Sequence, residues 1–514
     1  MKLLVQLALV ALIGGGEASA EDLWQMARQK ARVYRLSALF TAPDVRDSLS
    51  TEKGLSEAVA WCKQTGITKV YLETYQAKYQ ASQETLIKAR DRFKHEGFRV
   101  AGAITPTEVG KISTGWKIIS CFTNPGTQTD LRSIVEFTAQ IFDVIIIDDY
   151  LFTDCSCDEC DAARKRKEVR IRTKVYPVAS DSWEDYRSEL MLQVSRAIVV
   201  GAAKRINPNA RVIIKFPLWY DLYQDRGYDV ERETAVFDGV WVGTETRDRS
   251  NPLAKPQYGA YFLLRWIGGI AGRKLGGGWF DSENTSAKTY VEQARQTVLG
   301  GAKEAVLASY GELHRNFGPE DIAALRSSIP ELLEVAAQVR RRRPAGVAAY
   351  KPPGSVAGAE QMIFDYVGLL GIPLAPVHTF PVKAKAAFLP LHAWSDPDLV
   401  ERLNAFVDSG KPVLLTDGLA RRLAGKVKFG AARVLRVGQK PSSVLEMTQR
   451  QVDDLRQPLL KALGVEFQAP VDVALYLFTD GSWVVENFGN RDARVRLNGQ
   501  AMMLGRREWV YEWK

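Results

Sequence analysis

Histidine is scarce in this chain of 514 residues, which contains only four: His95, His314, His378 and His392. None of them stands in an H-E-x-x-H motif or in a spaced pair, which argues against a histidine-bound catalytic metal. The chain also lacks a G-x-S-x-G motif, so the nucleophile elbow of an α/β-hydrolase esterase is not expected. No G-x-G-x-x-G motif follows the early apolar runs, which disfavours a dinucleotide-binding domain.

Apolar runs long enough to cross a bilayer are absent as well. The apolar run at residues 3–13 follows Lys2 and leads into three glycines and then Ala18-Ser19-Ala20. A basic start, a short apolar stretch and an A-x-A ending are typical of a cleavable secretory signal. We therefore expect a signal peptide over residues 1–20 and a mature chain that begins near Glu21. The protein is expected to be exported, to the periplasm or the outside, with no transmembrane segment after signal removal.

Neither sign of charge dominates, because 69 basic and 60 acidic residues leave a net charge of +9. The bases form no stripe with interleaved aromatic residues, so a nucleic-acid partner is not expected. Apolar residues make up 46% and charged residues 25%, as in globular proteins, and the length predicts two or three domains. The 12 tryptophans fit either aromatic platforms for sugar rings or the core of a large barrel.

Short apolar or β-branched runs alternate with amphipathic stretches through the first two thirds of the chain. The runs cover residues 33–40, 69–74, 99–104, 116–122, 144–150, 211–216, 239–243, 276–280 and 305–310. Continuous apolar strands separated by helices predict a parallel sheet that is buried on both faces. The number of units favours a (β/α)8 barrel of the TIM type over residues 21–340. The run 116–122 is one too many, and we assign it to the loop between the third and fourth strands.

Two smaller domains are predicted after Pro344. Strands are expected at residues 347–350, 386–390 and 412–416, with helices at 358–370 and 397–409, which indicates a smaller α/β domain over residues 345–465. From about Val471 the runs become short, and the turn dipeptides Asp480-Gly481 and Asn498-Gly499 separate them. Such turns between short strands predict an antiparallel β module over residues 466–514.

Acidic side chains follow several of the predicted strands, at the end of a barrel where active sites lie. Asp148 and Asp149 come directly after an apolar run, and Glu245 follows the run 239–243. Asp281 and Glu283 follow the run 276–280. Burial of such groups is unfavourable unless they face a polar cavity, a metal or a partner. The alternative explanations are a helix cap for the Asp pair and a surface ion pair for Glu245.

Converging carboxyl groups suit glycoside hydrolysis, which needs one acid to protonate the leaving oxygen and one carboxylate to attack or to activate water. Arg247 would keep Glu245 ionised, whereas one of the adjacent aspartates would retain its proton. The division of these roles stays open. Further candidates for binding a carbohydrate are side chains at or beyond strand ends and nearby aromatic residues: Lys215, Trp219, Arg247, Trp279, Tyr310 and Glu312. Trp241 and Trp266 lie close to the same strands in sequence.

Three of the five cysteines fall within six residues, as Cys155-Ser156-Cys157-Asp158-Glu159-Cys160. Disulfides are possible in an exported protein. The C-x-C-x2-C spacing is also that of a compact thiolate cluster, in which Cys121 would complete a tetrahedral zinc site.

The order of motifs and domains resembles glycoside hydrolase family 42, the clan A β-galactosidases. In that family the strand-4 acid is followed by a C-x-C-x2-C cluster, as Asp148-Asp149 is here. The resemblance implies a structural, non-catalytic zinc bound by Cys121, Cys155, Cys157 and Cys160. It also implies an amidotransferase-like second domain that serves self-association, followed by a small β domain. No cysteine occurs after Cys160, so amidotransferase activity is not expected.

The chain departs from family 42 at both catalytic positions. Asp148-Asp149 replaces the family's Asn-Glu, and only Asp281 or Glu283 could take the place of its strand-7 nucleophile. The β-galactosidase specificity is therefore not transferred. A strand-4 aspartate is also similar to that of retaining α-glycosidases, which implies Asp149 as the nucleophile and Glu245 as the acid and base. The remaining alternatives are a non-catalytic carbohydrate-binding scaffold on a degenerate barrel and a metal-dependent hydrolase that uses the Asp pair.

Overall fold

The computed structural model describes residues 20–247, 255–316, 318–430, 432–438 and 440–514. The predicted signal segment, residues 1–20, lies outside this range except for its last residue. No helix in the described part of the chain combines the length and the apolar character needed to cross a membrane.

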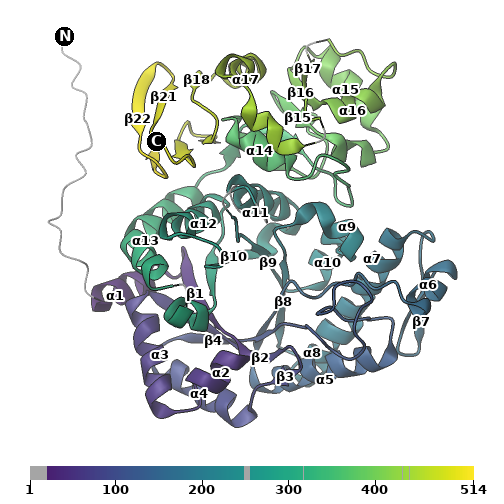
Figure 1. The fold of residues 1–514 in the computed structure, drawn as a ribbon, viewed down its shortest axis with the longest axis vertical. Coiled ribbons are helices and arrows are strands. Elements are labelled where there is room, and N and C mark those ends of the chain that lie inside the picture. The colour runs from purple at the N-terminus through teal and green to yellow at the C-terminus, as the bar shows by residue number, and fades with distance from the viewer. Residues whose placement is uncertain (1–19, 248–254, 317, 431, 439) are drawn as a thin grey trace.

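Eight parallel strands close into a barrel, as predicted (Figure 1). They are β1 (Arg35–Phe40), β2 (Ile67–Gln76), β4 (Arg99–Ile104), β5 (Val144–Ile147), β8 (Arg211–Phe216), β9 (Gly239–Gly243), β10 (Leu275–Asp281) and β11 (Glu304–Ala308). Each strand pairs in parallel with the next along the chain, and β11 and β2 both pair with β1, which closes the ring. The short β3 (Tyr79–Gln80) returns antiparallel to the end of β2. The surplus run 116–122 forms no barrel strand and lies in the loop after β4, as expected.

Helices connect the strands and cover the outside of the barrel. Before and between the first strands lie α1 (Ala20–Lys30), α2 (Ala42–Ser48), α3 (Glu52–Gln64), α4 (Gln83–His95) and α5 (Pro125–Ile141). The long connection from β5 to β8 contains α6 (Asp158–Lys165), the hairpin β6–β7 (Glu168–Ile171, Lys174–Pro177), α7 (Trp183–Gln193), a π-helical segment (Val194–Val200) and α8 (Gly201–Ile206). The remaining helices are α9 (Tyr223–Arg226), α10 (Val230–Val236), α11 (Tyr258–Ala271), α12 (Ala287–Leu299) and α13 (Pro319–Arg340).

The inside of the barrel is packed solid by alternate residues of the strands. Its core consists of Leu39, Tyr71, Ala101, Ala103, Ile146, Ile213, Trp241, Trp279 and Val306, which form one buried cluster. Because side chains alternate across a strand, every second residue beyond this cluster also points toward the barrel axis. Those residues determine what stands at the carboxyl-terminal opening.

A second sheet of five parallel strands follows the barrel, in the order β14-β13-β15-β16-β17. Its strands are β13 (Val347–Tyr350), β14 (Leu374–Val377), β15 (Ala387–Leu389), β16 (Val413–Thr416) and β17 (Ala432–Leu435). Its helices are α14 (Ile363–Leu369), α15 (Leu399–Asp408), α16 (Asp417–Leu423) and α17 (Gln449–Leu463). The three predicted strands are present, and β14 and β17 are additions because their sequences, with prolines or charges, do not form clean apolar runs.

The chain ends in a module of antiparallel strands, again as predicted. Its strands are β12 (Pro344–Ala345), β18 (Phe467–Gln468), β19 (Val473–Phe478), β20 (Trp483–Asn487), β21 (Ala493–Leu497), β22 (Gln500–Leu504) and β23 (Trp509–Glu512). Both smaller units pack on the α11–α12 side of the barrel (Figure 1). The rings of Phe262 in α11 and Phe364 in α14 stack at 4.3 Å, and Gln296 of α12 donates a hydrogen bond to Glu486 of β20.

Candidate active site

The carboxyl-terminal opening of the barrel carries charged side chains where the apolar core ends. Glu73 stands two residues after Tyr71, Asp148 two after Ile146, Lys215 two after Ile213 and Asp281 two after Trp279. The alternation of the strands therefore directs these four polar groups toward the axis, in one layer above the apolar residues. Glu245 follows β9 and joins the same layer.

Lys215 lies at the centre of this layer and contacts three carboxylates. Its Nζ lies 2.7 Å from Oδ2 of Asp149, 3.2 Å from Oδ1 of Asp148 and 3.6 Å from Oε1 of Glu245. The Lys215 side chain is only 4% exposed. Burial alone would lower the pKa of Lys215, but the three carboxylates raise it well above its ordinary value. The lysine thus remains charged and holds together three acids from the ends of two strands, β5 and β9.

The two residues that the sequence favoured as the catalytic pair have different electrostatic surroundings. Burial raises the pKa of Asp149 to about 8; Lys215 opposes this rise, and the charges of Asp148 and Glu245 add to it. Burial acts on Glu245 in the same direction, but the charges of Lys215 and Lys255 outweigh it and hold the pKa of Glu245 below its usual value. The sequence predicted that Arg247 would keep Glu245 ionised, whereas in the structure the charges of Lys215 and Lys255 lower the pKa of Glu245 more than Arg247 does.

Gly243 makes room for the Glu245 carboxylate. A Cβ atom at position 243 would lie 2.4 Å from Oε2 of Glu245, so any larger residue there would displace the Glu245 carboxylate from its present position. Oε2 is buried and has no hydrogen-bond partner among the described residues. A buried carboxylate oxygen without a partner is unfavourable unless water or a ligand completes its contacts, which makes Glu245 a candidate for contact with a ligand.

A cavity of about 990 Å³ opens above this layer. Of the predicted site residues, Asp148, Trp279, Asp281, Glu283 and Glu312 line it. Lys215, Asp149, Glu245 and Arg247 lie beside or beneath that lining. The cavity wall also contains residues that the sequence analysis did not select: Thr41, Asp44, Asp47, Glu73, Gln76, Thr105, Tyr150, Ser282, Asn284, Ser309 and Arg315.

Glu73 is the main functional candidate that the sequence analysis missed. Its carboxylate accepts hydrogen bonds from the hydroxyl of Thr105 and, at 2.8 Å, from the backbone N–H of Ala42. Thr105 also lies 3.2 Å from Oδ2 of Asp148, so a polar chain links the second, third and fourth barrel strands. Burial raises the pKa of Glu73 to about 8. The available signal was a lone acid near the end of a predicted strand, two residues after the aromatic Tyr71.

Asp281 lies on the opposite side of the cavity from Asp148. Arg247 pairs with Asp281 at 2.5 Å, whereas its distance to Glu283 is 3.9 Å. Burial raises the pKa of Asp281 to about 6, although the Arg247 charge opposes the rise. The Glu283 side chain is 71% exposed and lies at the edge of the cavity. Of the two acids that follow β10, Asp281 is therefore the one that faces the barrel axis.

Tyr310 and Trp219 do not reach the cavity. The chain turns away from the axis after β11, and the ring of Tyr310 stacks on Phe40 at 4.6 Å in the layer between strands and helices. Trp219 packs edge-on against Phe152 at 5.4 Å and against Tyr228 at 5.7 Å.

Two further tryptophans near these strands also lie elsewhere. Trp241 belongs to the apolar core inside the barrel, and Trp266 donates a hydrogen bond to the carbonyl oxygen of Lys351 in the second unit. Sequence proximity to a strand end does not show the side on which a ring packs.

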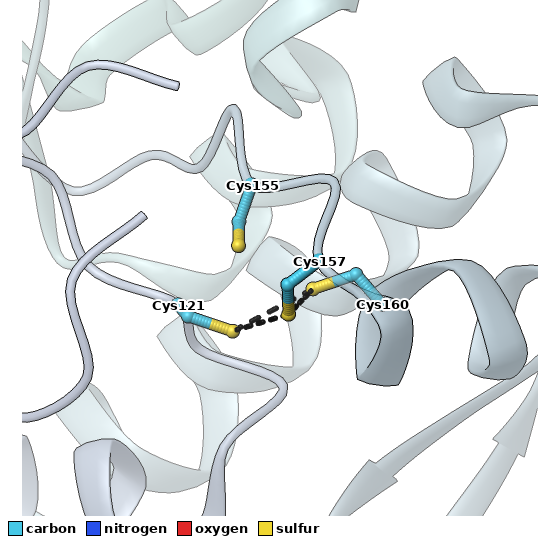
Figure 2. A group of neighbouring side chains, drawn as sticks. All are labelled: Cys121, Cys155, Cys157 and Cys160. Atoms are coloured by element: carbon cyan, nitrogen blue, oxygen red, sulfur yellow. Dashed lines mark hydrogen bonds between the residues drawn. The ribbon is translucent and has the colours of Figure 1, made fainter. Parts of the chain in front are cut away.

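The four predicted zinc ligands converge beside the active site (Figure 2). All four sulfur atoms lie within 4.8 Å of one another, and Cys121 Sγ lies 3.5 Å from Cys160 Sγ and 3.8 Å from Cys157 Sγ. A tetrahedral zinc with bonds of about 2.3 Å holds its sulfurs about 3.8 Å apart. The separations match this arrangement and greatly exceed a disulfide bond of about 2 Å.

Donors outside the cluster suit thiolates. Lys111 Nζ lies 3.5 Å from Cys157 Sγ, and Thr123 Oγ1 lies 3.0 Å from Cys160 Sγ. The cluster joins the loop after β4 to the loop after β5, the strand that Asp148 and Asp149 follow. Asp154, one residue before the cysteine motif, accepts hydrogen bonds from Ser113 and from the backbone N–H of Trp116. These contacts tie the loop after β4 to the loop after β5.

A closed (β/α)8 barrel with several acids around its carboxyl-terminal opening is the architecture of a barrel enzyme. Residues 20–330 match the family model described as "Probable glycosyl hydrolase, catalytic domain". This match covers more than half of the chain, so the protein belongs to that family and is a glycoside hydrolase.

The chain is also similar to known proteins, one by sequence and two by structure. An uncharacterized protein of Saccharolobus solfataricus is 26% identical over 445 residues, which are 79% of this chain and 69% of that protein. The β-galactosidase of Rahnella sp. R3 has a similar structure, with a TM-score of 0.62, 12% identity, and coverage of 93% of this chain and 98% of its own. The α-L-fucosidase isoenzyme 2 of Paenibacillus thiaminolyticus is similar at 11% identity, with a TM-score of 0.60 over 90% of this chain and 93% of its own. Because these identities are low, the similarity to the two solved structures is a similarity of fold.

Proposed function

We propose that the enzyme cleaves O-glycosidic bonds with Asp148 and Asp281 as its two catalytic carboxyl groups. The observation that carries this proposal is their position: both line the same cavity, from the fourth and the seventh barrel strands, and both face the axis. Asp149 and Glu245 contact Lys215 from outside the lining of that cavity. We assign them to holding Lys215 and shaping the charge at the opening.

The surroundings of the two acids suit different roles. Asp148 is ion-paired with Lys215 and accepts a hydrogen bond from Thr105, which favours a charged oxygen that attacks the sugar or activates water. Asp281, with its pKa raised to about 6 by burial, can hold a proton near neutral pH and donate it to the leaving oxygen. Glycoside hydrolysis requires one carboxyl group that donates a proton and one carboxylate that attacks the sugar or activates water.

The charge of the cavity supports a neutral sugar as substrate. Seven carboxyl side chains line it, against the single guanidinium of Arg315. Such a wall repels uronic acids and sulfated sugars, while carboxylates accept hydrogen bonds from sugar hydroxyls. Trp279 and Tyr150 provide aromatic surface within the same cavity. We propose a neutral oligosaccharide, and β-galactosides and α-L-fucosides are the first compounds to test because enzymes of similar fold act on them.

Asp281→Asn tests the proposed general acid. In the wild type, kcat/KM for an aryl glycoside should fall as pH rises through about 6, because Asp281 loses its proton there. The variant should lose this limb of the pH profile. It should also lose about 10²-fold or more in rate with a poor leaving group, and much less with dinitrophenolate, which needs no protonation.

The comparison of leaving groups supplies the control, since one protein preparation is used with both. Equal losses with the two leaving groups, or an unchanged pH profile, would show that Asp281 is not the acid. Glu283→Gln is the matched variant, because Glu283 follows the same strand but is largely exposed. It should retain nearly the full activity and the wild-type pH profile.

We further propose that Cys121, Cys155, Cys157 and Cys160 bind one structural zinc ion. The sulfur separations and the donors near two of the thiols support it. When bound, the ion joins the two loops beside Asp148 and takes no part in the reaction, because the four sulfurs leave no open position for water.

Replacing Cys157 by Ser should remove the zinc and lower Tm by several degrees, because metal binding contributes directly to folding. Metal analysis and thermal unfolding measure both effects. Cys62→Ser is the control: Cys62 is buried but lies outside the cluster, so this variant should keep one zinc per chain. Wild-type protein without zinc would refute the site. Turnover by protein that has lost zinc but remains folded would exclude a metal-dependent reaction.

Export and self-association complete the proposal. The proposed signal ends at Ala20, the first residue of α1, and N-terminal sequencing of the secreted protein should begin near Glu21. For self-association we propose the second unit, whose edge strand β17 exposes Val434. Light scattering would reveal a mass above that of one chain, and a single-chain mass would refute it.

A further inference from the structure

The amino-terminal end of the barrel, opposite the active site, carries a second pattern of charge. Strands β1, β4 and β8 each begin with an arginine: Arg35, Arg99 and Arg211. Lys274 and Lys303 directly precede β10 and β11. Because the strands of a parallel barrel all start at the same end, these bases from distant parts of the sequence surround one opening. The barrel is thus acidic at one end and basic at the other.

A cavity of about 770 Å³ lies at this basic end. Ten lysine and arginine side chains line it, against three acids. It extends inward as far as Lys69 and Trp241, which are only 7% exposed and belong to the inside of the barrel. The size falls in the range of small-molecule sites, and the cavity shares no residue with the one above the catalytic layer.

Some of these bases have structural partners that account for them. Lys274 donates hydrogen bonds to the carbonyl oxygens of Thr234, Ala235 and Phe237 at the end of α10. A cation at a helix carboxyl terminus satisfies free carbonyl groups and the helix dipole. Arg340 similarly donates to the carbonyl oxygens of Arg32 and Val33.

Lys69 and Arg35 share the single buried carboxylate of Glu304, at 3.1 and 3.9 Å. The other two acids of the lining are engaged elsewhere, because Asp143 bonds Asn207 and Asp238 pairs with Lys204.

Five bases around the opening have no such partner. The side chains of Arg32, Lys94, Arg99, Arg211 and Arg273 form no ion pair or hydrogen bond within the described part of the chain. The charge of Arg99 affects the neighbouring Arg35. Burial lowers the pKa of Arg35, Glu304 raises it, and the positive charge of Arg99 lowers it. Deeper in the cavity, the indole Nε1 of Trp241 is buried and lacks a hydrogen-bond partner among the described residues. The unpaired positive charges and the free N–H of Trp241 lie in one cavity. Both favour a bound anion that accepts hydrogen bonds.

We propose that this cavity binds a small polyanion that carries at least two phosphate, sulfate or carboxylate groups, such as an anionic mono- or disaccharide. The five unpaired bases come from the segment before β1, from α4, β4 and β8, and from the segment before β10, so their charges surround the opening and do not converge on one point. One anionic group could contact only part of this ring, whereas two or more could contact opposite sides of it at once. The ligand is distinct from the substrate, because the acidic catalytic cavity repels anions.

Isothermal titration calorimetry of the full-length protein at about 0.15 M salt, where the screening length is about 8 Å, tests the proposal. The probes are fructose 1,6-bisphosphate, inorganic phosphate and fructose. Two double variants, Arg99→Gln with Arg211→Gln and Lys94→Gln with Arg273→Gln, each remove two charges from the opening. Lys426→Gln with Lys428→Gln removes the same charge from an exposed part of the second unit and serves as the control.

Fructose 1,6-bisphosphate should bind the wild type and the control with equal, submillimolar affinity. Each opening variant should bind it about ten-fold or more weakly, since two charge-assisted hydrogen bonds are lost. Inorganic phosphate should bind more weakly than the bisphosphate, and fructose should not bind. Equal affinity in all four proteins would mean nonspecific attraction to a basic surface and would overturn the proposal. So would absence of bisphosphate binding, binding of fructose alone, or equal affinity for the bisphosphate and for inorganic phosphate. Both opening variants should hydrolyse an aryl glycoside like the wild type, which verifies that they are folded.

Discussion

Asp148→Asn should lower kcat/KM for an aryl glycoside by about 10⁴-fold while leaving the fold intact. The amide has the shape of the carboxylate, so the hydrogen bond from Thr105 and the packing against β8 can persist. What is lost is the negative charge that attacks the sugar or activates water at the oxocarbenium-like transition state. Steady-state rates with a dinitrophenyl glycoside, together with the thermal unfolding curve, measure the two properties separately.

Asp149→Asn is the matched control, because it removes the same charge from the same Lys215 contact, one residue further along the chain. Asp149 lies outside the cavity lining, so its replacement should act only through the position of Lys215 and lower the rate about ten-fold. If Asp149→Asn abolishes turnover while Asp148→Asn leaves it nearly normal, the roles are reversed. In that case Asp149 with Glu245 becomes the better assignment.

Lys215→Met should produce the largest loss of stability of any single change in the barrel. It leaves Asp148, Asp149 and Glu245 together in a buried layer without their shared counter-charge. Removing one partner of a buried ion pair lowers the free energy of unfolding by about 3–5 kcal/mol. The loss should be smaller at pH 5 than at pH 8, because protonation of the carboxyl groups relieves their repulsion at the lower pH.

Lys204→Met is the comparison for this change. Lys204 also forms an ion pair, with Asp238, but its side chain is 40% exposed, so water screens the pair. Its replacement should change stability by less than about 1 kcal/mol at either pH. Thermal unfolding of both variants at the two pH values provides the measurement. Equal melting temperatures of the two variants would contradict the idea that Lys215 holds the carboxylate layer together.

Much of the architecture is readable from local patterns. The runs at residues 99–104, 211–216 and 239–243 coincide with strands β4, β8 and β9, because a strand buried on both faces must be apolar along its whole length. The cysteine spacing likewise predicts a compact cluster, since three ligands within six residues cannot lie far apart. The end of an apolar run also marks where acids such as Asp148 and Asp281 enter the layer at the opening.

Sequence by itself therefore determined the barrel, the order of the units and the strand ends that carry acids, because these follow from the spacing of apolar residues along the chain. Tertiary structure decided which side chains meet. It placed Lys215 among three acids, added Glu73 to the cavity wall, directed Tyr310 into the core, and gathered Arg99 and Arg211 at the opposite opening. The reason is that closure of the sheet brings together strands far apart in the chain, while the turn after each strand determines whether the next side chain faces the axis or the helices.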